Sequence, residues 1–103
     1  MNDKQKANEN YCNAMGQTIE QMDSEEFIDS YLVGEQFNIY LKDGDLWIDF
    51  ISGVNYYGEI NTSLQIRPDS SFRVERFGTS VGTFKHDSLY TDLMDSLYDI
   101  IER

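Results

Sequence analysis

Residues 37–50 constrain the fold of this chain more than any other segment, because they have the pattern of a β-hairpin. Apolar and polar side chains alternate on both sides of Asp43-Gly44, and an Asp-Gly loop of two residues favours a type I′ turn, in which both residues have positive φ. This turn predicts Tyr40 opposite Trp47 on one face of the hairpin, and on the other face the pairs Leu41–Leu46, Ile39–Ile48 and Phe37–Phe50. The apolar face needs another element to cover it.

Helical periodicity precedes the hairpin. Apolar side chains recur on one helical stripe at Ala7, Tyr11, Cys12, Met15, Ile19 and Met22. Asp23 or Ser24 can then cap a further helix, so two short helices, or one helix kinked near Asp23, fit the pattern. Residues 1–6 are polar and are predicted to form a tail, which leaves residues 7–103 as a single domain.

Further strands and a helix follow the hairpin. We expect a break at residues 52–55, a strand at 56–66, a turn at 67–70, and strands at 72–77 and 80–84 that are joined at Gly78-Thr79. The final helix has an apolar face formed by Leu89, Leu93, Leu97, Ile100 and Ile101. The sequence therefore predicts an α+β fold, an antiparallel β-meander of about five strands with an N-terminal helix or helices and a C-terminal helix packed on one face.

Residue content excludes several classes of site. The chain has one cysteine and one histidine, too few for a disulfide framework or for the usual thiolate and imidazole zinc sites. Cys12 and His86 could form a nucleophile and base, but no third orienting group accompanies them, so we expect Cys12 to be a buried structural thiol and His86 a surface or capping residue. We expect no catalytic residue and no enzyme activity.

Metal and cofactor sites are not expected either. Asp43, Asp45 and Asp49 lie in a loop that lacks the glycine and the closing glutamate of an EF-hand. Gly78 and Gly82 do not match the spacing of a phosphate-binding loop. No segment has the apolar length of a signal peptide core or a membrane span, which predicts a cytoplasmic protein.

Acidic residues are in excess and are unevenly distributed. The chain contains 19 acidic and eight basic residues, a net charge of −11. The flanking segments 1–34 and 86–103 together contribute −9 of this charge. Direct binding of a nucleic-acid backbone is disfavoured, because phosphate contacts need lysine and arginine. A basic protein surface is the expected partner, although such acidity can also serve solubility alone.

Two groups of side chains are predicted to bind a partner. The first is a row of carboxylates on one face of the final helix, spanning about 15 Å, at Asp92, Asp95, Asp99 and Glu102. The second is the aromatic pair Tyr40 and Trp47, on the face of the sheet that helices do not cover. Three arginines, Arg67, Arg73 and Arg76, are expected to pair with neighbouring acids.

Two resemblances bear on function. The run from Phe72 to Phe84, with its Gly82-Thr83-Phe84 element and a following helix, resembles the three-stranded sheet and helix of plant ethylene-response-type DNA-binding domains. That function is not carried over, because the flanks are acidic and basic residues are sparse. In size, acidity and lack of catalytic residues, the chain resembles small phage-encoded anti-defence inhibitors, the anti-CRISPR and DNA-mimic anti-restriction proteins.

The functional hypothesis follows from these observations. The sequence favours a non-enzymatic acidic protein that inhibits a basic, nucleic-acid-binding partner, such as the groove of a host defence nuclease. The alternative is a small structural or regulatory module that forms a homodimer through the aromatic face of its sheet.

Overall fold

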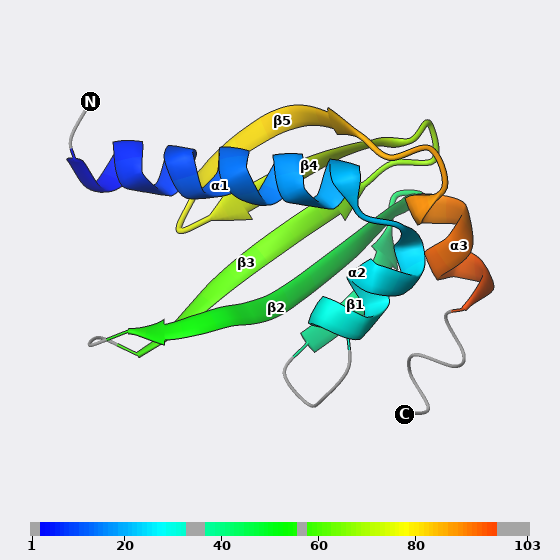
Figure 1. Cartoon of the computed structure of the whole chain (residues 1–103), viewed down its shortest axis with the longest axis horizontal. Helices are drawn as coiled ribbons and strands as arrows, with labels where there is room; N and C mark the ends of the chain where they lie inside the picture. Colours follow the sequence, from blue (N-terminus) through cyan, green and yellow to red (C-terminus); the bar gives the residue numbers. More distant parts are fainter. Residues whose placement is uncertain (1–2, 33–36, 56–57, 97–103) are drawn as a thin grey trace.

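The computed structural model describes residues 3–32, 37–55 and 58–96, and it has an α+β architecture (Figure 1). The elements are α1 (Asp3–Gln21), α2 (Ser24–Tyr31), β1 (Phe37–Lys42), β2 (Asp45–Asn55), β3 (Gly58–Ile66), β4 (Ser71–Arg76), β5 (Thr79–Lys85) and α3 (Leu89–Asp95). The strands form one five-stranded antiparallel sheet in chain order. The predicted fold class, a meander with N-terminal and C-terminal helices, is confirmed.

The β1–β2 hairpin has the predicted register. Tyr40 pairs with Trp47, and the three apolar pairs are also those expected. Asp43 and Gly44 have φ angles of 55° and 86°, so both turn residues lie in the left-handed region, as a type I′ turn requires. The three apolar pairs therefore lie on one face of the sheet, which we call the inner face, and Tyr40 and Trp47 lie on the other, the outer face.

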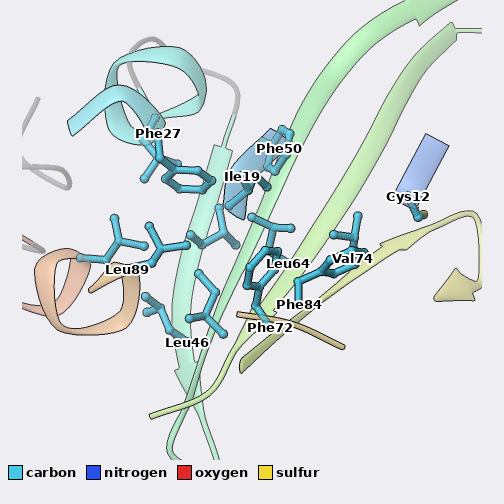
Figure 2. Close-up of a cluster of buried hydrophobic side chains, with 14 residues drawn as sticks. Cys12, Ile19, Phe27, Leu46, Phe50, Leu64, Phe72, Val74, Phe84 and Leu89 are labelled. Carbon is cyan, nitrogen blue, oxygen red and sulfur yellow. The ribbon is translucent and has the colours of Figure 1, made fainter. Parts of the chain in front are cut away.

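The helices pack on the inner face, with α1 along β4 and β5, and α2 and α3 beside each other toward β1 (Figure 1). The core between these layers consists of Cys12, Ile19, Phe27, Leu32, Leu46, Ile48, Phe50, Leu64, Ile66, Phe72, Val74, Phe84, Leu89 and Leu93 (Figure 2). Gly16 lets α1 approach the sheet closely, because a Cβ atom at this position would overlap the ring of Phe84. No described helix is long and apolar enough to cross a membrane.

The start of the chain differs from the prediction. Helix α1 begins at Asp3, so residues 3–6 are helical and are not a tail. Lys4, Gln5 and Lys6 are good helix formers that directly precede the amphipathic stripe, and their exposed side chains do not interrupt it. Two separate helices form, and Asp23 is the N-cap of α2, its Oδ1 accepting a hydrogen bond of 2.8 Å from the backbone N–H of Glu26.

Two strand boundaries also differ. Residues 52–55 do not break the sheet: β2 runs through them to Asn55, and a register shift between Ile51 and Gly53 accommodates one extra residue. The last hairpin turns at Phe77-Gly78 and not at Gly78-Thr79, because Arg76 pairs with Thr79. The turn at 67–70 is confirmed.

Candidate interaction surfaces

Helices α2 and α3 bring the two acidic flanks of the sequence together. The side-chain oxygens of Ser24 and Ser88, at the starts of these helices, lie 3.4 Å apart. Phe27 of α2 and Leu89 of α3 point into the same core (Figure 2). We define the α2–α3 acidic surface by the carboxylates on and next to these helices: Asp23, Glu25, Glu26, Asp29, Asp87, Asp92 and Asp95. All are exposed except Asp92, which is half-buried.

No basic residue interrupts this surface within either segment. The sequence has no lysine or arginine between Lys6 and Lys42, and none between Lys85 and Arg103. Five of the eight basic residues lie on or next to the strands, at Lys42, Arg67, Arg73, Arg76 and Lys85. The charge is therefore uneven: α2 and α3 carry acidic residues without any basic one, whereas residues 37–85 carry five basic and six acidic residues.

The predicted carboxylate row is only partly within the described structure. Asp92 and Asp95 lie on α3, which ends at Asp95 with Ser96 as its C-cap. Asp99 and Glu102 fall outside the described residues. The sequence prediction missed the contribution of α2, whose four carboxylates at residues 23–29 join Asp92 and Asp95 in space. The absence of lysine and arginine from residues 7–41 is the sequence signal that could have indicated this contribution of α2.

Tyr40 and Trp47 form the second candidate surface, on the outer face of the sheet. Their rings are stacked, with centroids 6.4 Å apart and an interplanar angle of 5°. Tyr40 is 44% exposed and Trp47 is half-buried. Partial desolvation and the nearby Asp49 and Glu75 carboxylates raise the pKa of the Tyr40 hydroxyl. This pair presents an apolar surface with a polar tip, as protein interfaces often do.

Within the described structure, Arg76 contacts aromatic rings and Arg67 contacts a polar side chain, where the sequence predicted ion pairs with neighbouring acids; Arg67 also acts electrostatically on the Asp69 carboxylate. The Arg76 guanidinium lies over the Tyr11 ring, 4.0 Å from its centroid, and 5.5 Å from that of Phe77. Arg67 donates to the Ser71 hydroxyl at 3.4 Å. Among the described residues, the buried Nε atoms of Arg73 and Arg76 have no hydrogen-bond partner.

Cys12 and His86 do not form a catalytic pair. The Cys12 thiol is buried and donates to the Thr79 carbonyl at 3.7 Å, and burial raises its pKa, as expected for a structural thiol. Of the two predicted roles for His86, surface or capping residue, the surface role is wrong: His86 is buried, because its Nε2 bonds the Met22 carbonyl at 2.7 Å just beyond α1. This bond holds His86 at the end of α1, whereas Cys12 lies nine positions before that end, about 14 Å away along the helix axis.

The described residues contain no cluster of histidine, cysteine, aspartate or glutamate that could hold a metal ion. Comparison with protein-family models, curated proteins and solved structures gives no match for this chain. The α2–α3 acidic surface and the Tyr40–Trp47 pair are therefore the candidate functional surfaces of this chain.

Proposed function

We propose that this protein is a non-enzymatic, cytoplasmic inhibitor that binds the basic nucleic-acid groove of a protein partner, of the class that includes CRISPR effectors and restriction nucleases. The α2–α3 acidic surface carries this proposal. Carboxylates spread over two adjacent helices, without intervening cations, present a negative field to which a phosphate-binding groove is complementary. In this respect the helical layer resembles the charge of a nucleic-acid backbone.

The uneven distribution of charge supports this function over simple solubility. A protein that is acidic only for solubility needs net charge but no particular arrangement of it. Here the sheet keeps five basic residues while α2 and α3 have none. The Tyr40–Trp47 stack favours a second candidate function, a module that forms a homodimer through the outer face of the sheet.

The proposal is tested by competition with DNA. Labelled duplex DNA is bound to purified nucleic-acid-binding proteins, including an RNA-guided nuclease and a restriction endonuclease, and its anisotropy is followed as this protein is added. We expect displacement from at least one of them, with an affinity that falls steeply as salt rises, because the contacts are electrostatic.

Two variants of equal charge locate the surface. Glu25→Gln, Asp29→Asn and Asp95→Asn neutralise the α2–α3 acidic surface, and Asp3→Asn, Glu9→Gln and Glu75→Gln make the same change in charge elsewhere. The first variant should displace DNA at least about tenfold less effectively, since exposed charge pairs contribute up to about 1 kcal/mol each. Displacement reduced equally in both variants would show that net charge alone acts, and no displacement by the wild-type protein would contradict the proposal.

A further inference from the structure

The two edge strands of the sheet are treated differently. At the β5 edge, α1 packs along the strand (Figure 1). Glu20 of α1 accepts a hydrogen bond from the Lys85 backbone N–H at 3.0 Å. Native proteins protect edge strands in this way, because unpaired main-chain groups recruit other strands.

The β1 edge has no such protection within the described structure. In a hairpin with a two-residue loop, the flanking residues Lys42 and Asp45 form a hydrogen-bonded pair, and the pairs then alternate. The main-chain groups of Phe37, Ile39 and Leu41 therefore point away from β2. No other described backbone group bonds to them. The strand also lacks proline and has no bulge in its pairing with β2.

Strand β1 also carries exposed apolar side chains. Only three large apolar side chains in the described structure are strongly exposed, and two of them, Tyr40 at 44% and Leu41 at 51%, lie on β1. Leu41 is on the inner face, where it extends the apolar row beyond the cover of the helices. Residues 36–42 contain no acidic residue, although the chain has 19. Among the described residues, this edge is therefore unpaired, and it carries exposed apolar side chains and no acidic residue.

We propose that β1 pairs with β1 of a second copy of this chain, antiparallel and centred on Ile39, so that two sheets become one continuous sheet. This register is self-complementary: it joins the outward main-chain groups of both strands and places Phe37 opposite Leu41 of the second copy. In this register, the apolar side chains on the inner face form a continuous row across both copies, and so do the outer-face side chains, which include Tyr40. The surface differs from the α2–α3 acidic surface and does not depend on the proposed function.

Salt should strengthen this dimer. Each copy has a net charge of −11, and α2 has no basic residue; its Tyr31 ring contacts Phe50 of β2, the strand next to β1. Salt screens the repulsion between two such copies, whereas it weakens binding of the acidic surface to a basic partner. The two interactions therefore respond to salt with opposite signs, and the failure of one can be distinguished from the failure of the other.

Sedimentation velocity of the full chain, from micromolar to several hundred micromolar and at low and moderate salt, tests the proposal. We expect the mass to rise from 12.0 kDa towards twice that value. Hydrogen exchange of the Ile39 and Leu41 amides should slow as concentration rises, because pairing protects them. A protein that stays monomeric under all these conditions would overturn the proposal.

Variants identify the edge. Leu41→Pro removes an outward N–H that β2 does not use, and Leu41→Lys adds a charge at the exposed edge; each should weaken dimerisation about tenfold or more. Ser80→Lys adds the same charge at an exposed position of β5 and should have no effect. Circular dichroism confirms folding of each variant, and Leu41→Lys gives the result if Leu41→Pro unfolds. A dimer that Leu41→Lys leaves intact forms through another surface, and the proposal is then wrong.

Discussion

Phe77 and Asp43 occupy the same position in two turns of the same type. Their φ angles are 52° and 55°, and each is followed by a glycine with φ of 80° or 86°. Aspartate tolerates this left-handed conformation, whereas a bulky aromatic residue rarely adopts it. Phe77 is also 62% exposed, so its ring gains little from burial. Because backbone strain of this kind concentrates at functional positions, Phe77 is a further candidate contact for a partner.

Phe77→Asn should stabilise the fold. Asparagine adopts the left-handed conformation at lower cost, so the free energy of unfolding should rise by about 1 kcal/mol. For a domain of this size the midpoint of thermal unfolding should rise by about 4–8 °C. Asp43→Asn is the matched control and should change stability by less than about 0.5 kcal/mol. A loss of stability in Phe77→Asn would instead show that the contact of its ring with Arg76 supports the fold.

At the scale of elements, the carboxylates of α2 and α3 are not placed for stability alone. Asp29 lies in the last turn of α2 and Asp95 ends α3, and neither last turn contains a basic residue. The C-terminal end of a helix carries partial negative charge, so carboxylates there are unfavourable. Glu25, in the first turn of α2, is favourable by the same argument. Two carboxylates of the acidic surface, Asp29 and Asp95, are thus retained at positions where they destabilise their own helices.

Asp29→Asn and Asp95→Asn should therefore each raise the free energy of unfolding, by about 0.3–1 kcal/mol at low ionic strength. Helix propensity does not account for this gain, since asparagine and aspartate have similar values. Glu25→Gln is the control, and it should lower stability through the same dipole. Urea unfolding of the three single variants measures these changes. Equal effects of either sign at both helix ends would show that net charge, and not the dipole, is responsible.

Local signals predicted the elements better than their ends. Asp43-Gly44 fixed the first hairpin, because both residues favour the turn that forms. The second turn begins one residue before the predicted position, since no propensity predicts phenylalanine at positive φ. The predicted break at residues 52–55 is instead a register shift with one extra residue in β2. A bulge is stabilised by the neighbouring strand, and a single sequence does not reveal that contact.

The candidate surfaces show the same limit. Tyr40 and Trp47 could be predicted, because strand alternation alone determines which side of a hairpin each residue occupies. The carboxylates of α2 could not be joined to those of α3, because contacts between sequence-distant helices bring them together. Burial of His86 was missed for this reason too: its partner, the Met22 carbonyl, is 64 positions away.

At the scale of the whole molecule, charge opposes folding. A net charge of −11 produces self-repulsion that is larger in the folded protein than in the expanded unfolded chain. Within the described structure, Arg76 contacts rings, while Arg67 and Lys85 act electrostatically on one carboxylate, that of Asp69, so basic side chains offset only part of this repulsion. The core must therefore supply the stability that electrostatics removes.

Moderate salt should consequently stabilise this protein. The Debye length falls from about 30 Å at 0.01 M to about 10 Å at 0.1 M ionic strength, so repulsion across the molecule is screened over this range. We expect the urea midpoint to rise with sodium chloride, with an unchanged m value, because the surface exposed on unfolding stays the same. The variant Glu25→Gln, Asp29→Asn and Asp95→Asn should show a smaller rise than the variant Asp3→Asn, Glu9→Gln and Glu75→Gln, since its neutralised residues lie where no cation offsets them. A midpoint that falls with salt would mean that favourable ion pairs outweigh repulsion. The acidic surface would then not destabilise the fold, and partner binding would not be needed to explain why it is retained.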